Sequence, residues 1–340
     1  DETYGSEAQK VVKTSNYVTS QGIIPVLNNG AVGFKDETER IINQVRHGSE
    51  KLDIVSIVGM PGLGKTTLAQ RVYRDPSIIR DFHIRAWCNV SQVYCMKDLL
   101  LELLRGINPD VSKKYCDMDE QDLAHKLLNS LQRYRYFIVL DDIWNIDAWN
   151  ILKRSFPDDK KGSRVLITSR QYEVASQVEP DRLRQFTDDE SWDLLQKMLF
   201  PTEPYPPELC TIGKQIAENC GGLPLTVVIV AGILATIEQD GWKQFAERMS
   251  ARNVSLTEQS MNMLELSYRH VPDYLKPCLL YAGAFPQGQE IPIQRLLRLW
   301  IAEGFVKEVE QKKVEEVAED YMMDLIGRSL IIVSKQRSFG

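Results

Sequence analysis

The segment that most constrains this chain is Gly-Met-Pro-Gly-Leu-Gly-Lys-Thr, residues 59–66. It follows a short β-branched run at 53–58, the pattern of a buried strand, and leads into a helical pattern at 65–74. Glycines in such a turn let backbone N–H groups and the helix N-terminus point at an anion. The segment therefore predicts a phosphate-binding loop with the Walker A pattern Gly-x-x-x-x-Gly-Lys-Thr.

Each residue type in this loop suits a polyphosphate. Gly62 and Gly64 allow the turn. Lys65 supplies positive charge for the β- and γ-phosphates, and the Thr66 hydroxyl is placed to ligate Mg²⁺. The loop is not a dinucleotide fingerprint, because Thr67 stands where a third glycine is required. The residues predicted to contact nucleotide here are Gly59, Gly62, Leu63, Gly64, Lys65, Thr66 and Thr67.

A second motif is acidic. The apolar run at 136–140 ends in Asp141 and Asp142, the Walker B pattern. A buried parallel strand delivers such residues to the sheet edge where the phosphate loop lies. We expect Asp141 to hold Mg²⁺ together with Thr66. We expect Asp142 to orient or deprotonate an attacking water, which makes the two carboxylates the candidate catalytic residues.

The next apolar run, 164–168, ends in hydroxyls followed by Arg170. A guanidinium at that strand end is predicted to contact the γ-phosphate. The Asn-Lys-x-Asp segment typical of GTP-specific sites does not occur in the sequence, so adenine is the favoured base. The ABC-transporter signature does not occur either, which disfavours that class of pump.

Strand and helix patterns alternate over residues 31–186. This predicts an α/β P-loop NTPase domain with a parallel sheet covered on both faces, preceded by a polar linker or arm at 1–30. Strands are expected at 53–58, 84–90, 136–140, 164–168 and near 183–186. Helices are expected at 36–45 with Asp36 as the cap, and at 65–74, 96–105, 119–133, 147–154 and 171–177.

Helical patterns dominate after Thr187. Thr187-Asp-Asp-Glu190 is a capping box that opens a helix at 191–200. A helical-bundle subdomain is predicted over 187–252, with further helices at 207–219, 223–236 and 241–251. A winged-helix subdomain is predicted over 253–340, with helices at 260–269, 272–284, 292–303 and 314–327 and a strand at 330–333. Its third helix is mostly apolar, so we expect it to pack against protein.

Composition excludes several classes of protein. A net charge of −6 disfavours a general nucleic-acid surface. The scattered cysteines and histidines form no zinc or disulfide pattern. The longest apolar run, 223–235, is too short to span a bilayer.

These motifs, in this order, resemble the NB-ARC module of plant intracellular NLR immune receptors. The resemblance extends from about Val32 to the chain end and is closest to the coiled-coil class, including the solanaceous helper receptors. Besides the phosphate motifs it rests on Val32-Gly33-Phe34, the block at 82–90, Leu140-Asp-Asp-Ile-Trp144, Gly222-Leu-Pro-Leu225 and the block at 278–286.

The resemblance implies a molecular switch with at most weak ATPase activity. It implies a closed resting state with ADP, and an active state with ATP and Mg²⁺ that rotates its subdomains, oligomerises and signals defence and cell death. It also implies that Val32 contacts adenine, and that Pro224 and Leu225 tie the helical subdomain (ARC1) to the base. Pro224 suits this position because it has no N–H and fits a first helical turn.

The partners implied are the receptor's own coiled-coil and leucine-rich-repeat domains, sensor immune receptors and further copies of the chain. Neither nucleic acid nor membrane contact is expected for this segment. The expected location is the plant cytoplasm, with membrane association only of the activated full-length receptor.

One departure from the family pattern concerns the winged-helix subdomain (ARC2). The Met-His-Asp motif of the family is not found before Gly340, so we expect an incomplete latch in this chain. Two other functions stay open at this point. An actively cycling ATPase of the STAND or AAA kind would show fast turnover, and a winged-helix DNA-binding regulator would show salt-sensitive DNA binding.

Overall fold

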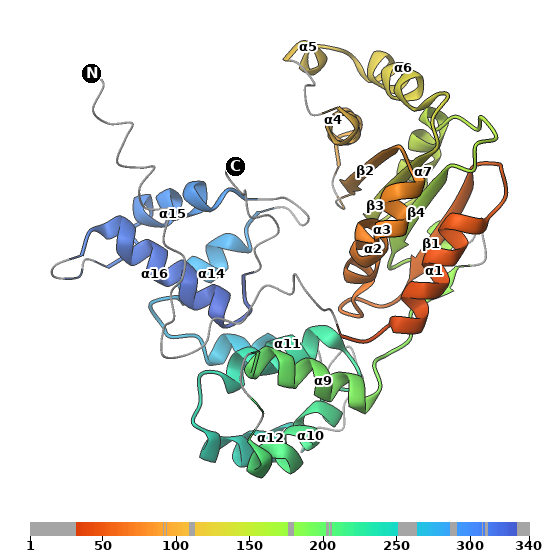
Figure 1. Cartoon of the computed structure of the whole chain (residues 1–340). Coiled ribbons are helices and arrows are strands. Elements are labelled where there is room, and N and C mark those ends of the chain that lie inside the picture. The colour runs from red at the N-terminus through yellow and green to blue at the C-terminus, as the bar shows by residue number, and fades with distance from the viewer. Residues whose placement is uncertain are drawn as a thin grey trace.

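The computed structural model describes residues 32–331. Its gaps are residues 91, 93, 109–112, 176–179, 202, 203, 205, 251–263, 286–290, 308, 310 and 311. The predicted arm at 1–30 and the end of the predicted strand at 330–333 lie outside the described residues. Figure 1 shows a sheet with its helices, a group of helices below it, and a further helical group beside both.

The sheet has five parallel strands in the order β2-β3-β4-β1-β5. Their bounds are β1 Asp53–Val58, β2 Ile84–Asn89, β3 Tyr136–Ile143, β4 Arg164–Ser169 and β5 Asp181–Arg182. Side chains alternate between the two faces: Phe137 and Val139 of β3 join one core, and Ile138 and Leu140 join the other. The sheet is therefore buried on both sides, and the predicted α/β parallel-sheet class is confirmed.

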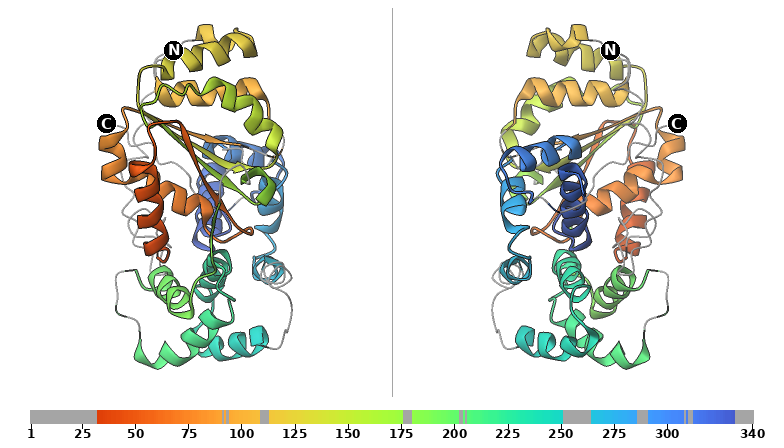
Figure 2. Two further views of the ribbon diagram at one scale, coloured as in Figure 1. Left: turned by 90° about the vertical axis from the view of Figure 1, so that its right-hand side faces the viewer. Right: turned by 90° about the vertical axis from the view of Figure 1, so that its left-hand side faces the viewer.

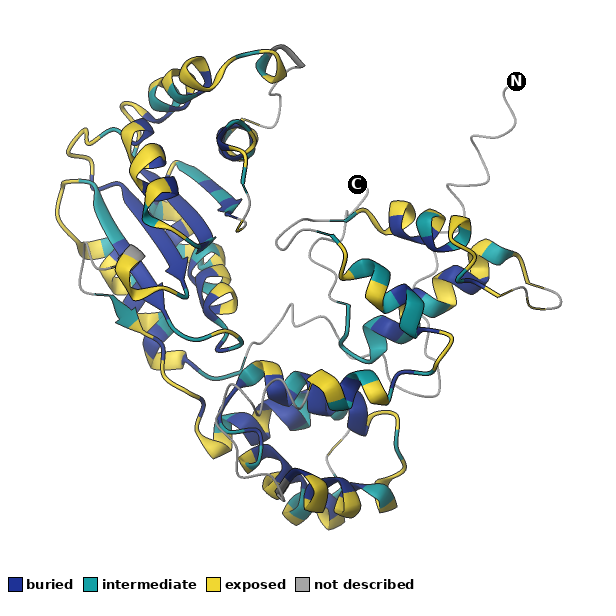
Figure 3. Cartoon of the chain, turned by 180° about the vertical axis from the view of Figure 1, so that it is seen from behind, coloured by how far each residue is buried: buried dark blue, intermediate teal, exposed yellow. Residues whose placement is uncertain are grey.

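Helices cover each face of the sheet. On one face lie α1 Lys35–His47, α2 Lys65–Arg74 and α3 Pro76–Asp81; on the other lie α4 Met96–Ile107, α6 Glu120–Leu131 and α7 Ile146–Leu152. Short helices α5 Lys113–Cys116 and α8 Tyr172–Ala175 complete this part. Figure 3 shows the strands mostly buried and the outer helix faces exposed.

The structure corrects three local predictions. Asp36 is not the cap of α1, because Phe34 takes the cap position and its carbonyl accepts the N–H of Thr38 at 2.9 Å. β3 continues to Ile143, since its pairing with β4 resumes there after an irregularity.

Among the residues that the structure describes, the last strand is β5 at 181–182 rather than 183–186. Beyond β5 the N–H of Leu183 still donates to the carbonyl of Val58 in β1, and then the chain turns away and the N–H of Phe186 donates to the carbonyl of Gly222.

The second group of helices is α9 Asp188–Leu199, α10 Cys210–Glu218, α11 Pro224–Leu234 and α12 Trp242–Ser250. The predicted capping box is confirmed: the N–H of Glu190 donates to Thr187 Oγ1 at 3.1 Å, and the Glu190 carboxylate accepts the Thr187 N–H at 2.9 Å. Both side views in Figure 2 place this group below the sheet. Its apolar residues belong to the same core as the α1–α3 face.

The third group contains a helical segment at 264–269, α14 Lys276–Ala282, α15 Ile293–Ala302 and α16 Val314–Gly327. The predicted helix at 272–284 is shorter at its start, because 272–275 form a turn. Leu330 and Ile331 are not part of a strand. Leu296, Leu297 and Trp300 of α15 are buried in a core of this group's own, whereas Ile293 at the start of the helix is exposed. The domain boundaries at 30, 186 and 252 stay a prediction.

Candidate nucleotide-binding site

The phosphate loop connects β1 to α2 in left-handed turns that only glycine adopts easily. The φ angles are +81° at Gly62 and +92° at Gly64. Gly64 is also the cap residue of α2, and no side chain caps that helix. The first N–H groups of α2 are thus left for an anion. Leu63 anchors the loop in the core, whereas Thr67 is exposed in the first turn of α2.

Lys65 crosses the inside of the loop. Its side chain is 7% exposed, and its ammonium donates to the carbonyls of Gly59 at 2.8 Å and Met60 at 3.0 Å. Burial lowers the pKa of Lys65 to about 8, although the nearby carboxylates of Asp142 and Asp141 oppose this shift. The loop therefore encloses one cation that two acidic residues face.

Thr66 and Asp141 come together as predicted from their motifs. The Thr66 hydroxyl lies 2.9 and 3.0 Å from the two carboxylate oxygens of Asp141, which is 5% exposed. Burial raises the pKa of Asp141, and hydrogen bonds from Thr168 and Thr66 act against that rise. Hydroxyl and carboxylate oxygens are ligands that Mg²⁺ accepts, so this pair fits that ion.

Thr168 was not among the predicted site residues. Its hydroxyl donates to Asp141 and accepts the backbone N–H of Asp142 at 2.8 Å. The available signal was a hydroxyl at the end of the neighbouring strand, two positions before Arg170. This hydroxyl indicates a contact with Asp141 only when it is known that β4 lies next to β3 in the sheet.

Asp142 and Arg170 form an ion pair with each other. Asp142 has a left-handed backbone (φ +58°) at the irregularity in β3. Its carboxylate accepts two bonds of 3.1 Å from Arg170, whose guanidinium lies over the ring of Trp144, 4.5 Å from its centroid. Asp142 was predicted to act on an attacking water and Arg170 to contact the γ-phosphate. Both roles therefore depend on the ion pair between these two side chains.

The Gly222–Leu225 segment touches the phosphate loop directly. Pro224 is the first residue of α11 and has no backbone N–H. The first backbone N–H of that helix therefore belongs to Leu225. This amide donates to the carbonyl of Gly62 at 3.1 Å. The predicted contact of Pro224 and Leu225 was with a base. The contact with the loop itself was missed, because no pattern within either segment indicates it.

Val32, the residue predicted to contact adenine, is half-buried. It packs against the core that contains Phe34 and Leu63. The ring of Phe34 is the nearest group to a Cβ built on Gly64, at 3.6 Å. The predicted adenine side is thus adjacent to the phosphate loop.

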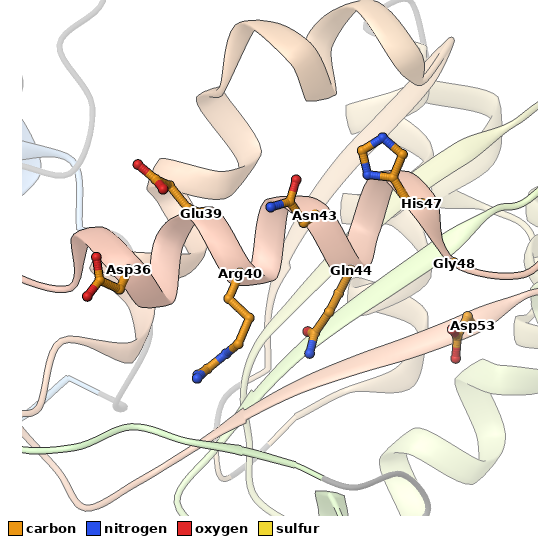
Figure 4. Close-up of a pocket in the computed structure, with 8 residues that line it drawn as sticks. All are labelled: Asp36, Glu39, Arg40, Asn43, Gln44, His47, Gly48 and Asp53. Atoms are coloured by element: carbon orange, nitrogen blue, oxygen red, sulfur yellow. The ribbon is translucent and has the colours of Figure 1, made fainter.

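A hollow of about 670 Å³ lies elsewhere, along the outer side of α1. Figure 4 shows its polar lining, and Arg40 there is paired with Asp181 at 2.8 Å. Within the part of the chain that the structure describes, no group of three or more His, Cys, Asp or Glu could hold a metal ion, so this hollow offers no such centre. It is lined by Asp36, Glu39, Arg40, Asn43, Gln44, His47, Gly48 and Asp53.

Sequence comparison agrees with the geometry of the loop and sheet. The family model of the NB-ARC domain matches residues 34–204. The chain belongs to the NB-ARC family. The model of the disease resistance protein winged helix domain matches residues 284–340 of this NB-ARC chain. The family and the winged helix predicted from the motifs are therefore confirmed.

Curated relatives of this NB-ARC chain include two late blight resistance protein homologs of Solanum demissum. R1B-16 is 42% identical over 319 residues, which cover 92% of this chain and 24% of that protein. R1B-12 is 40% identical over 331 residues, which cover 95% of this chain and 24% of that protein. The NB-ARC chain thus spans about a quarter of the length of the curated relatives it matches.

Solved structures show the same fold at low identity. The STAND protein with a tetratricopeptide repeat sensor from Pyrococcus horikoshii has a TM-score of 0.51 at 17% identity, covering 89% of this chain and 46% of that one. Cdc6p from Pyrobaculum aerophilum has a TM-score of 0.51 at 14% identity, covering 94% of this chain and 98% of that chain. At these identities the likeness concerns the fold alone. Among the described residues of the NB-ARC chain, no helix is long and apolar enough to cross a bilayer.

Proposed function

We propose that this chain is the adenine-nucleotide switch module of a plant disease-resistance receptor. Its resting state is closed with ADP bound, and its active state has ATP and Mg²⁺ bound. The observation that carries the proposal is the 3.1 Å bond from the Leu225 amide to the Gly62 carbonyl. Through it the helical group rests on the loop that would hold the phosphates. A ligand in this loop can therefore shift the arrangement of the two groups.

Each residue of the loop would have its own task in binding the phosphates. The turn at Gly62 and Gly64 would present backbone amides to the phosphates, and Lys65 would supply the positive charge. Thr66 and Asp141 would hold the Mg²⁺ of the ATP state, an ion that neutralises phosphate charge when bound. Val32, Pro224 and Leu225 are proposed for the side of the base.

The contacts of Asp142 favour a switch over a working ATPase. A carboxylate that orients an attacking water needs a free oxygen facing that water. In this structure both oxygens of Asp142 accept bonds from Arg170, and Trp144 backs the guanidinium. Slow turnover follows from that pairing. Movement of Arg170 to a γ-phosphate would release Asp142 in the ATP state.

The partners proposed for the whole receptor are its other domains, sensor immune receptors and further copies of this chain. The proposed location is the cytoplasm of the plant cell. The Solanum relatives are called late blight resistance protein homologs, and their much greater length leaves room for further domains. DNA binding is disfavoured by the net charge of −6.

The first experiment identifies the nucleotide that the purified chain retains. The protein is prepared without added nucleotide and denatured, and the released small molecules are separated by chromatography. Stoichiometric ADP, with turnover below about 0.01 per second against a usual enzyme range of about 1 to 1,000 per second, supports the switch. Rapid turnover with no retained nucleotide would favour the cycling ATPase instead.

A further inference from the structure

The turn at Val32, Gly33 and Phe34 lies where the proposed switch must couple two parts of the molecule. Its φ angles are +72° at Gly33 and +54° at Phe34. A left-handed phenylalanine is unfavourable by itself, so its surroundings must hold it in place. One edge of the Phe34 ring faces Gly64 of the phosphate loop, and the ring packs edge-on against Phe186, with centroids 4.8 Å apart.

Two polar side chains bond to the backbone of this turn. Arg71 of α2 donates to the carbonyl of Gly33. Glu190 of α9 accepts the N–H of Phe34 at 3.2 Å. Since α2 starts at the phosphate loop and α9 starts the helical group, the turn is attached to both.

The Glu190 carboxylate is itself fixed by further bonds. Arg184 donates to its two oxygens at 2.6 and 2.9 Å, and the N–H of Thr187 donates at 2.9 Å. Arg184 also pairs with Glu37 of α1 at 2.8 Å. A capping-box glutamate needs only the bond to its own cap residue. The bond from Glu190 to Phe34, 156 positions away, is therefore an addition that α9 does not require.

We propose that Glu190 is a positioning residue for the base side of the nucleotide site. It holds the Val32–Phe34 turn beside the phosphate loop and links that turn to the first turn of α9. This inference rests on the proposed function, in which the phosphates lie in the loop at 59–67 and the adenine lies toward Val32. Loss of the Glu190 carboxylate frees the amide of Phe34 and loosens the base side, while the phosphate contacts of Lys65 stay intact.

The test compares binding of ADP and of inorganic pyrophosphate to the 340-residue chain by calorimetry. Glu190→Ala should weaken ADP binding about tenfold, the size expected for one lost hydrogen bond to a charged group. Pyrophosphate affinity should stay within about twofold, because it reports the loop alone. Glu190→Gln should restore most of the ADP affinity, since its carbonyl oxygen still accepts the Phe34 N–H.

Glu316 provides the matched control, because its carboxylate also accepts the N–H of a helix cap residue, Lys313 before α16, at 3.2 Å. Glu316→Ala should leave both affinities unchanged. Two outcomes would overturn the positioning role. One is that Glu190→Ala weakens the affinities for ADP and for pyrophosphate equally, and the other is that a folded Glu190→Ala binds ADP as tightly as the wild type. A wild-type chain that binds neither ligand would overturn the proposed function itself, and the role of Glu190 with it.

Discussion

Lys65 is the residue on which nucleotide binding should depend most. Its compact ammonium makes two bonds inside the loop and is 7% exposed. A guanidinium keeps the charge but is larger and planar, so it cannot occupy the same space. Lys65→Arg should lower ADP affinity at least about 100-fold, measured by calorimetry, which corresponds to about 2.7 kcal/mol.

The control for this variant is Lys214→Arg on the exposed side of α10, which changes the same residue type away from the loop. It should bind ADP as the wild type does. Tight ADP binding by a folded Lys65→Arg chain would contradict the assignment of the loop.

Glu190 gives a prediction on pH. Hydrogen bonds from Arg184 lower the pKa of Glu190 to about 2, against 4.5 without the protein environment. An acid with a lowered pKa stabilises the fold above pH 4.5, and its contribution is lost as the pH falls toward 2. The difference in unfolding free energy between wild type and Glu190→Gln should therefore be constant from pH 8 to about 5 and shrink below pH 4.5. Denaturant unfolding at several pH values measures it.

A double-mutant cycle with Arg184→Met is the control. Without the guanidinium, the pH-dependent part of the difference should shrink to the share that the backbone N–H groups of Thr187 and Phe34 still supply. If it persists at full size, the cause lies in another partner of Glu190.

At the scale of elements, the structure agrees with the sequence wherever a local period or cap signal is strong. The capping box at 187–190 and the start of α11 at Pro224 were both predicted from neighbouring residues and are present. The end of β3 was missed because it depends on pairing with β4, which resumes at Ile143 and Ser169. That pairing also places Asp142 in its left-handed conformation next to Arg170.

Pro224 tests the role of α11. Leucine at this position removes the fixed backbone angle and adds an N–H next to the amide that bonds to Gly62. Pro224→Leu should increase the ADP dissociation rate about tenfold, equivalent to about 1.4 kcal/mol, as measured with a fluorescent ADP analogue.

Pro76→Leu is the matched control, because Pro76 is the exposed first residue of α3. Its ADP dissociation rate should equal that of wild type. An unaltered rate in Pro224→Leu would remove the start of α11 from the nucleotide site.

At the scale of the whole molecule, the hydrophobic cores show which parts of the chain pack together. The core on the α1–α3 face of the sheet continues into α9–α12, whereas α14–α16 have a separate core. The winged-helix part should therefore separate from the other two parts at lower cost than those two parts separate from each other. One close contact across that division is between Gly232 of α11 and the backbone of Arg328, at the end of α16.

Gly232→Ala tests this contact. A Cβ at Gly232 would collide with the carbonyl oxygen of Arg328, so α11 and the end of α16 must move apart. We expect a loss of about 1–3 kcal/mol of stability, faster proteolysis of the winged-helix part and a larger radius of gyration in small-angle scattering.

Gly327→Ala, one residue before Arg328, is the control, since a Cβ there meets nothing within 4 Å. It should keep the wild-type radius and cleavage pattern. The same outcome for Gly232→Ala would show that the contact does not restrain the winged-helix part.

The sequence by itself determined the phosphate loop, the acidic strand end, the alternating α/β pattern and the family. Each of these depends on residues a few positions apart, whose spacing suits one local backbone geometry. Only the tertiary structure decided that Arg170 pairs with Asp142, that Leu225 bonds to Gly62 and that Glu190 holds Phe34. These contacts join segments far apart in the chain, and they form because strand order and the shared core bring those segments together.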